Sequence, residues 1–280
     1  MNRIHIIKNI FQRSIGKKKS LTFVFHCAMK SLTNKMKENL VIIPTYKEKE
    51  NIEKIIRTVF KLPTIFHILI IDDHSPDGTA DIVKKLMLEF PEPLHLVERA
   101  GKLGLGTAYI TGFRWALEHN YQYIFEMDAD FSHNPQDLIR LHDACLNGAD
   151  LAIGSRYISG INVVNWPLER VLMSYFASLY VRMVTGMNVH DSTAGFVCYS
   201  NKVLKTIDLD DIRMKGYGFQ IEMKFTTWKH RFKIKEVSIV FIDRQEGTSK
   251  MSGGIFSEAL FGVIKMKWRS FFKKYKRDAA

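Results

Sequence analysis

The chain of 280 residues is 46% hydrophobic and carries 41 Lys and Arg against 29 Asp and Glu, a formal net charge of +12. This length and hydrophobic content predict one large domain with a buried core, or one domain with appendages. No apolar run approaches the ~20 residues of a membrane-spanning helix, since the longest, residues 171–184, contains Arg182. The three cysteines, Cys27, Cys145 and Cys198, have no metal-binding spacing and cannot all pair, so we expect a reducing compartment.

The positive charge is a property of the two ends of the chain. Residues 1–37 hold nine Lys or Arg and no acid, and residues 265–277 hold seven more. Residues 38–264 are slightly acidic, with 25 basic and 28 acidic side chains. Basic ends of this kind predict contact with an anionic surface, which the charge alone leaves as either a membrane or a nucleic acid.

Three strand-like segments come first, and each leads into a polar loop and then a helical pattern. Leu40–Ile43, Ile68–Ile71 and Leu94–Val97 are apolar and rich in β-branched residues, which favours buried strands. The loops that follow them span residues 44–48, 72–79 and 101–108. Apolar side chains at positions 52, 55, 56, 59 and 60 give the first following helix its spacing.

The loop at 101–108 contains three glycines, and a helix is predicted after it over residues 106–118. It lacks the Gly-Lys-Ser/Thr ending of a phosphate-binding P-loop, which excludes an ATPase site of that type. We expect its glycines to let the backbone approach a ligand, with Lys102 near phosphate.

A fourth apolar segment, Tyr121–Met127, ends in two carboxylates one residue apart, Asp128 and Asp130. In an extended chain positions i and i+2 face the same way, so both can hold one hard cation. Mg²⁺ and similar cations take oxygen ligands and share their shell with substrate phosphates. An Asp-x-Asp can also serve only to cap a turn, and its neighbours decide between the two interpretations.

Two arginines follow later strand-like segments. Arg156 comes after Leu151–Gly154, and Arg244 comes after Val237–Ile242. Arginine at a strand end suits bidentate contact with phosphate, although any single arginine can instead form a surface ion pair. The last predicted element is a basic amphipathic helix over 255–275, which favours either a membrane-surface helix or a helix packed on the domain with a solvated basic face.

Strands and helices alternate every 25–30 residues or so, which predicts a parallel sheet covered on both faces. Ligands of such sheets bind outside the carboxyl ends of the strands. The four polar loops all follow strands, so we expect them to converge at that edge.

These pieces resemble the inverting family 2 glycosyltransferases, and more narrowly their dolichyl- or polyprenyl-phosphate mannosyltransferase branch. The matching motifs are Pro-Thr-Tyr-Lys-Glu, Asp-Asp-His-Ser-Pro-Asp-Gly-Thr, Gly-Leu-Gly-Thr-Ala-Tyr, Met-Asp-Ala-Asp-Phe-Ser-His, Gly-Ser-Arg-Tyr, and Phe-Ile-Asp-Arg-x-x-Gly-x-Ser-Lys ending at Lys250. They span residues 40 to 254 or so. The Asp-x-Asp is shared by many glycosyltransferases, whereas Gly-Leu-Gly-Thr-Ala and Asp-Arg…Ser-Lys are more specific to this branch.

The resemblance implies an α/β fold of the GT-A type, a Rossmann-like three-layer sandwich with a mostly parallel central sheet. We expect this domain over residues 36–254 and a basic amphipathic helix over 255–280. Residues 1–35 do not match the family and form a basic N-terminal extension, disordered or at a membrane surface. A targeting peptide, a membrane-surface helix and a start placed too far upstream all remain open for them.

The resemblance also assigns the nucleotide-sugar site. Its expected residues are Pro44, Tyr46, Glu48, Ile71, Asp73, Lys102, Asp128, Ala129, Asp130, Arg244 and Lys250. The expected metal ligands are Asp128 and Asp130, with Mg²⁺ or Mn²⁺ as the ion. Some family members place a Gln where this chain has Ser132, so water or diphosphate oxygens are expected to complete the shell. The chain also departs from the family pattern at Lys47, commonly Asn, and His74, commonly Gly.

For the acceptor phosphate, the expected residues are Arg156, Arg170, Ser174 and Arg244. The expected catalytic residues are Asp128, Asp130, Arg156 and Arg244. A polyprenyl monophosphate is already largely dianionic at neutral pH, because its second pKa is about 6, so it needs no general base. It needs to be held in line with the sugar carbon.

The resulting hypothesis is a peripheral enzyme at the cytoplasmic face of a membrane. It would transfer mannose from GDP-mannose to dolichyl or polyprenyl phosphate with inversion, giving a lipid-linked β-D-mannosyl phosphate, with no nucleic-acid partner. One alternative keeps the fold and changes the donor, for example to UDP-glucose. A dehalogenase-like phosphatase also uses Asp-x-Asp, but Ser132 and the late position of the pair argue against it. A non-enzymatic basic membrane-binding protein is the third alternative.

Overall fold

The structure, a computed structural model, describes residues 37–243 and 255–275, with side chains in the second range from residue 260 onward. Its strands and helices, in chain order, are β1 (Lys37–Thr45), α3 (Ile52–Phe60), β2 (His67–Asp72), α4 (Thr79–Glu89), β3 (Leu94–Glu98), α5 (Leu105–Glu118), β4 (Tyr121–Glu126), α6 (Asp137–Leu146), β5 (Leu151–Ser155), β6 (Val163–Val164), α7 (Leu168–Thr185), β7 (Val197–Ser200), α8 (Asn201–Thr206), the short 3-10 helix η1 (Leu209–Asp211), α9 (Tyr217–Lys229), β8 (Ile234–Ser238), β9 (Phe241–Ile242) and α10 (Ile255–Arg269).

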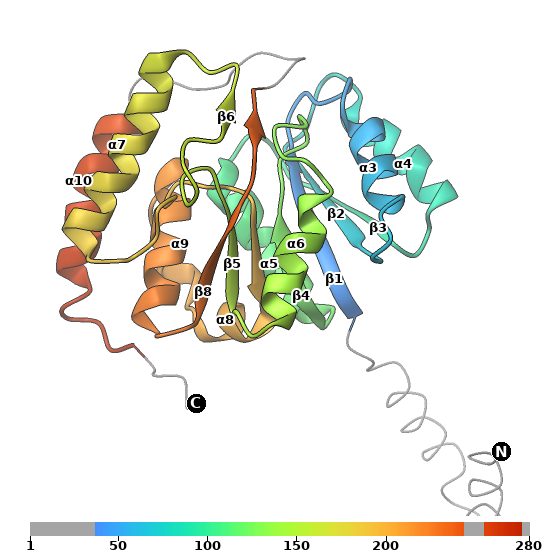
Figure 1. The fold of residues 1–280 in the computed structure, drawn as a ribbon. Coiled ribbons are helices and arrows are strands. Elements are labelled where there is room, and N and C mark those ends of the chain that lie inside the picture. The colour runs from blue at the N-terminus through green and yellow to red at the C-terminus, as the bar shows by residue number, and fades with distance from the viewer. Residues whose placement is uncertain (1–36, 244–254, 276–280) are drawn as a thin grey trace, which may run out of the picture. The chain divides into compact units, whose positions relative to one another are not determined.

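The described strands form a seven-stranded sheet in the order β3-β2-β1-β4-β7-β5-β8, with a separate pair β6-β9 (Figure 1). β2 pairs in parallel with β1 and β3, and β8 pairs in parallel with β5. β7 is antiparallel to both of its neighbours, β4 and β5. The predicted α/β architecture with a mostly parallel sheet is confirmed, and β7 is the strand that the alternation of elements did not anticipate.

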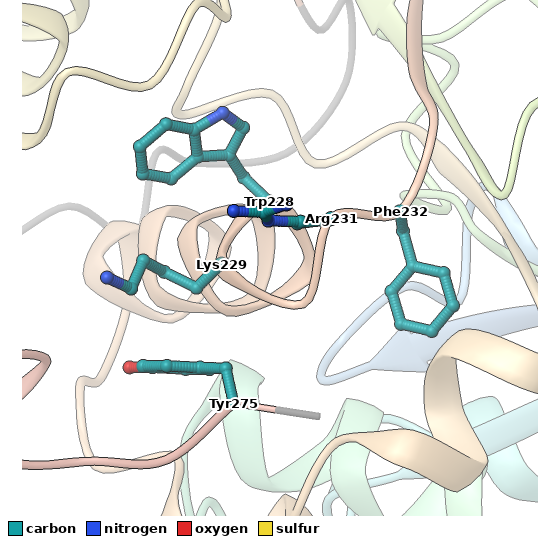
Figure 2. A pocket seen from close by; sticks show the side chains of 5 residues that line it. All are labelled: Trp228, Lys229, Arg231, Phe232 and Tyr275. Atoms are coloured by element: carbon teal, nitrogen blue, oxygen red, sulfur yellow. The ribbon is translucent and has the colours of Figure 1, made fainter. Parts of the chain in front are cut away.

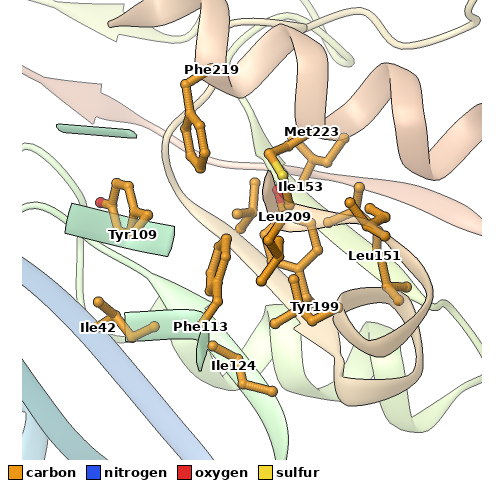
Figure 3. Packing of buried hydrophobic residues seen from close by; sticks show 14 of the residues in the cluster. Ile42, Tyr109, Phe113, Ile124, Leu151, Ile153, Tyr199, Leu209, Phe219 and Met223 are labelled. Carbon is orange, nitrogen blue, oxygen red and sulfur yellow. The ribbon is translucent and has the colours of Figure 1, made fainter. Parts of the chain in front are cut away.

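Each face of the sheet packs into its own hydrophobic core, which makes three layers. Side chains of β1 alternate between the faces, as expected for a strand. Leu40 and Ile42 pack in one cluster with residues of α5 and α9, including Phe113 and Phe219 (Figure 3). Val41 and Ile43 belong to the other cluster, which includes residues of α3, α4 and α6. These buried strands are apolar on both faces because helices cover both.

The order of the strands reverses between β1 and β4. From β1 the chain goes outward to β2 and β3, and then returns to place β4 on the other side of β1. Ligands of open α/β sheets bind at the carboxyl ends of the strands where the order reverses in this way. The loops after Thr45 and Glu126 therefore flank the expected site.

The segment Val237–Ile242, predicted as one strand, is divided between two sheets. β8 ends at Ser238, opposite the last residue of β5, Ser155. Just beyond this point the amide of Ile239 donates to the carbonyl of Ser155 at 3.1 Å, and the amide of Phe241 then donates to the carbonyl of Asn162 at 3.0 Å. β9 then pairs in parallel with β6.

The C-terminal helix is shorter than predicted, because α10 ends at Arg269. The Ser270 hydroxyl donates back to the carbonyl of Lys267, and the amides of Phe271 and Phe272 bond three residues back, which tightens and stops the helix. α10 lies beside α7 and α9 (Figure 1), with Val263 and Met266 buried. Among the described residues, no helix combines the length and the apolar character needed to cross a bilayer.

Both departures from the family pattern near the first two loops lie in the left-handed region of backbone conformation. The φ angle is 58° at Lys47 and 56° at His74. Asn and Gly adopt this conformation at lower cost than other residues.

We therefore expect Lys47→Asn to raise the free energy of unfolding by about 0.5–1 kcal/mol, because Asn tolerates positive φ better than Lys. Chemical denaturation of the purified protein measures the change. Lys49→Asn, two residues away and outside the left-handed region, is the matched control and should gain nothing. Equal gains in the two variants would show that the loss of a lysine, rather than relief of backbone strain, is responsible.

Candidate active site

The Asp-x-Asp pair lies directly after β4, at the carboxyl edge of the sheet. The side chain of Asp128 is 41% exposed, whereas Asp130 is 8% exposed and its Oδ1 accepts the amide of Ser132 at 3.1 Å. Phe131, between Asp130 and Ser132, has a φ of 59°, a rare conformation for a bulky residue. It turns the chain sharply enough for the Ser132 amide to reach back to Asp130. The carboxylate of Asp130 is thus held by the loop, whereas that of Asp128 is exposed.

These two carboxylates have the chemistry of a site for a hard divalent cation. Among the described residues, no group of three or more His, Cys, Asp or Glu could hold a metal ion. Magnesium commonly binds one or two carboxylates and takes its other ligands from water and substrate phosphates. Asp128 and Asp130 fit a cation held in that way, and they do not fit one enclosed by the protein alone.

His133 is buried against the same loop and binds its backbone. It is buried, stacks on Phe196 with ring centroids 4.8 Å apart, and accepts the amide of Asp128 on Nδ1 at 3.4 Å. Burial lowers the pKa of His133 to about 4, so the imidazole is neutral at physiological pH and can act as this acceptor.

The loops after β1 and β2 lie side by side, because the two strands pair in parallel with Pro44 opposite Ile71. Beyond the strands, the ammonium groups of Lys102 and Lys47 lie 5.1 Å and 5.7 Å from the centre of the Tyr46 ring. A flat ring flanked by two cations suits an aromatic, negatively charged ligand.

Glu48 and Asp73, also predicted to hold the donor, both have protein partners. The Glu48 amide donates to Thr79, and its carboxylate accepts from Asn51 at 3.4 Å, so it also stabilises the start of α3. Asp73 is buried, and its Oδ1 accepts from Arg99 Nε at 2.6 Å. This leaves one carboxylate oxygen of Asp73, Oδ2, for a ligand.

Arg99 was not anticipated from the sequence, and it joins the loop after β2 to the glycine loop. Besides Asp73, it donates to the hydroxyl of Thr107 at 2.8 Å and to the carbonyl of Gly104 at 3.3 Å. Gly104 has a φ of 100°, which only glycine adopts readily. The signal in the sequence was an arginine immediately after β3, whereas the prediction for this loop rested on its glycines.

Arg156 is buried at the end of β5 and paired with Asp191. Its Nε and Nη2 donate to the two carboxylate oxygens at 2.7 Å and 2.6 Å, and Nη2 also donates to Thr193 at 2.8 Å. Burial alone would lower the pKa of Arg156 and raise the pKa of Asp191, but their mutual attraction reverses both shifts. Nη1 makes no hydrogen bond to the described residues and is the group left for a ligand.

Arg170 and Ser174, on α7, lie next to Arg156. The guanidinium of Arg170 stacks on Trp166 at 4.0 Å, and its Nη1 donates to both oxygens of Asp243 at 3.0 Å. Ser174 accepts the hydroxyl of Tyr157 at 2.7 Å. The described members of the predicted acceptor set therefore come together in space.

The ring of Phe241 connects the carboxylate loop with the arginine site. It lies 5.3 Å from the His133 ring and 5.2 Å from the Trp166 ring, and Arg156 lies 5.7 Å from its centre. The amide of Ile242 also donates to the carbonyl of Ser132 at 3.3 Å. The expected metal and acceptor sites are therefore close together, with Phe241 in contact with residues of both. Ala129 is buried between the two aspartates, and Arg244 and Lys250 lie outside the described residues.

A buried polar group beneath the carboxylates was also missed. Lys224 on α9 is fully buried and donates to the carbonyl of Ala194 at 2.6 Å, while Gln220 donates to Glu126 at the end of β4. Burial raises the pKa of Glu126 and lowers that of Lys224. A lysine in a helical segment that also carries Phe219, Ile221, Met223 and Phe225 was the available signal.

A cleft of about 550 Å³ lies elsewhere, lined by Trp228, Lys229, Arg231, Phe232 and Tyr275 (Figure 2). It is next to the start of β8, where the amide of Leu151 at the start of β5 donates to the carbonyl of Lys233. These are the amino ends of both strands, so the cleft is at the edge opposite the carboxylates and arginines.

Known proteins resemble this chain in sequence and in fold. The model of the family "Glycosyl transferase family 2" matches residues 40–208. The chain is 47% identical to a polyprenol monophosphomannose synthase of Mycolicibacterium smegmatis over 80% of this chain and 84% of that protein. It is 46% identical to an undecaprenyl-phosphate mannosyltransferase of Micrococcus luteus over 81% and 92%. A dolichol-phosphate mannosyltransferase of Pyrococcus furiosus is 34% identical, with 63% of its length covered.

Among solved structures, a glucosyl-3-phosphoglycerate synthase from Mycobacterium tuberculosis, in complex with Mn²⁺ and UDP, superimposes with a TM-score of 0.61. The alignment covers 86% of this chain and 83% of that one at 16% identity, a likeness of fold. The extent of the family match and the identity to the mannosyltransferases make the protein a glycosyltransferase, and the chain belongs to glycosyltransferase family 2.

Proposed function

We propose that the protein transfers mannose from GDP-mannose to dolichyl or polyprenyl phosphate with inversion, at the cytoplasmic face of a membrane. The product is then a lipid-linked β-D-mannosyl phosphate. The observation that carries the proposal is the contact of a two-carboxylate site and a two-arginine site through Phe241. The names of the relatives at 46–47% identity support the sugar and the lipid phosphate.

The reaction needs a leaving group that is stabilised and a nucleophile that is held in place. An oxygen of the acceptor phosphate forms a bond to the anomeric carbon while the bond from that carbon to the diphosphate breaks, and GDP leaves. A divalent cation at Asp128 and Asp130, Mg²⁺ or Mn²⁺, would neutralise the charge on the departing diphosphate. Lys102, which lies beside Tyr46, would help to neutralise the charge on the same diphosphate.

On the donor side, we assign the remaining contacts to the two loops after β1 and β2. Pro44, Tyr46 and Glu48 would line one wall, and Ile71 and Asp73 the other. The oxygen of Asp73 that Arg99 does not use can accept hydrogen bonds from the base or ribose. Ala129, Arg244 and Lys250 complete the proposed set.

On the acceptor side, the phosphate would meet Nη1 of Arg156 and the Nε and Nη2 of Arg170, none of which donates to a described residue. Ser174 and Arg244 complete this proposed set. Asp191 and Asp243 each pair with one guanidinium, but each arginine retains donors that they do not use. A dianionic phosphate is the kind of ligand that satisfies such donors.

The proposal is tested by transfer of radiolabelled sugar to polyprenyl phosphate with a panel of nucleotide sugars. We expect GDP-mannose with Mn²⁺ or Mg²⁺ to give labelled lipid, EDTA to abolish transfer, and Asp130→Ala to abolish it while weakening donor binding. Transfer from UDP-glucose in place of GDP-mannose would contradict the donor, and full turnover in EDTA would contradict the metal.

Arg170 offers a cleaner test of the acceptor than Arg156, because removing Arg156 leaves the buried Asp191 without its partner. We expect Arg170→Ala to raise the KM for polyprenyl phosphate by roughly tenfold or more, with KM for the donor little changed. Arg170→Lys should restore little, because the planar fork and the stacking on Trp166 are lost. Arg182→Ala, on the same helix, is the control. Full rescue by lysine would rule out fork-like recognition.

Two helices support contact with a membrane. α10 exposes Phe261, Ile264 and Trp268 although its other face is packed on the domain, and Phe271 and Phe272 just beyond it are 69% and 75% exposed. α7, which lies beside α10 in Figure 1, exposes Leu168, Leu172, Met173, Phe176 and Met183. Exposed apolar side chains with flanking cations are typical of membrane-surface helices.

We expect the full chain to bind vesicles containing anionic lipid, more weakly as salt rises, since each cation near the surface contributes roughly 1 kcal/mol before screening. The double variant Trp268→Ala/Phe272→Ala should lose most of the binding in a sedimentation assay. Ile65→Ala/Leu88→Ala removes two equally exposed apolar side chains from elsewhere and is the control. Equal binding to neutral and anionic vesicles, or none to either, would leave α10 as a packed helix only.

A further inference from the structure

Trp166 lies between the two arginines of the proposed acceptor site, and the backbone on both sides of it is constrained. Asn165 before it has a φ of 64°, and Pro167 after it, the N-cap residue of α7, has a φ of −57°. Just ahead, β6 pairs with β9, and the amide of Asp243 donates to the carbonyl of Val164 at 3.1 Å. These features fix where the indole ring stands relative to Phe241 and Asp243.

The indole ring is in contact with both guanidinium groups. Arg170 lies 4.0 Å and Arg156 5.4 Å from the ring centre, both within the roughly 6 Å range of a cation–π interaction. The edge of the ring also packs against Phe241, with centroids 5.2 Å apart. One ring therefore contacts both guanidinium groups, each of which is also paired with an aspartate.

The polar atom of Trp166 argues against a role as a filler of space. Nε1 is buried and has no hydrogen-bond partner among the described residues, which costs free energy. A phenylalanine would fill much of this space without that cost. What indole offers beyond phenyl is the stronger interaction with cations.

We propose that Trp166 is a positioning residue of the acceptor-phosphate site, which sets the spacing of Arg156 and Arg170 through cation–π contact with both. The inference rests on the proposed function, because it takes the ligand of the two arginines to be the phosphate of a polyprenyl acceptor. By this arrangement the donors left unused by Asp191 and Asp243 face one phosphate.

The experiment compares Trp166→Phe, Trp166→Leu and the wild type in transfer from the nucleotide sugar to polyprenyl phosphate. We expect Trp166→Leu to raise the KM for the lipid roughly tenfold and Trp166→Phe roughly threefold, in the order of cation–π strength, with the KM for the donor changed less than twofold. Trp166→Phe should unfold at the same temperature as the wild type or higher, because it removes the unpaired N–H. Trp228→Leu, in the cleft of Figure 2, controls for loss of an indole elsewhere.

Three outcomes overturn the inference. An unchanged lipid KM in a folded Trp166→Phe, together with an unchanged or unfolded Trp166→Leu, shows that the ring does not position the arginines. Parallel loss of thermal stability and activity in Trp166→Phe shows that its role is structural. A wild type that transfers sugar to no polyprenyl phosphate, though it binds nucleotide sugar, overturns the proposed function and the inference with it, and is distinguished because all variants are then equally inert.

Discussion

The active-site region depends on the buried ion pair between Arg156 and Asp191. Both side chains are almost completely removed from water, so each charge is tolerated only because the other is present. The pair also fixes geometry, because a fork of two hydrogen bonds allows one relative orientation. It ties the end of β5 to the segment that leads into β7. Glu236 on β8 holds that segment in turn, since its carboxylate accepts the amides of His190 and Asp191.

A similar arrangement supports the carboxylate side. Glu126 ends β4 and lies two residues before Asp128, and it is held through Gln220 near the buried ammonium of Lys224. Lys224 also binds the carbonyl of Ala194, three residues beyond Asp191. Lys224 thus connects the residues that hold Glu126, before the aspartates, with the segment that contains Asp191. Because buried polar groups are costly when unpaired, these networks are expected to be rigid.

Much of the fold could be predicted from the sequence, because strands buried on both faces and helices with a regular apolar spacing are local patterns. The positions of Asp128, Asp130 and Arg156 at strand ends followed from the same patterns. Asp191 could not be found in this way. It precedes an antiparallel strand, and its partnership with Arg156 depends on the place of β7 between β4 and β5, which no local pattern encodes.

Other omissions have related causes. Trp166 lies in a loop, and its role follows only from which cations surround it in space. Arg99 was not predicted, because its hydrogen bonds to the glycine loop cannot be inferred from the spacing of the glycines. The prediction of one strand over Val237–Ile242 was wrong, because β5 ends at Ser155, opposite Ser238, before the second part of the segment.

The walls of the proposed acceptor site come from two parts of the chain, which bears on how such enzymes diversify. The segment matched by the family model, residues 40–208, contains the aspartates and the loops after β1 and β2, and it also contains Arg156, Trp166 and Arg170. Phe241 and Asp243, which wall the arginine site, lie beyond it, as does Glu236. Changes in the last third of the chain can therefore reshape the wall formed by Phe241 and Asp243 while the aspartates and the loops after β1 and β2 are kept. A single scaffold could in this way give rise to lineages that share a donor and differ in the phosphate that receives the sugar.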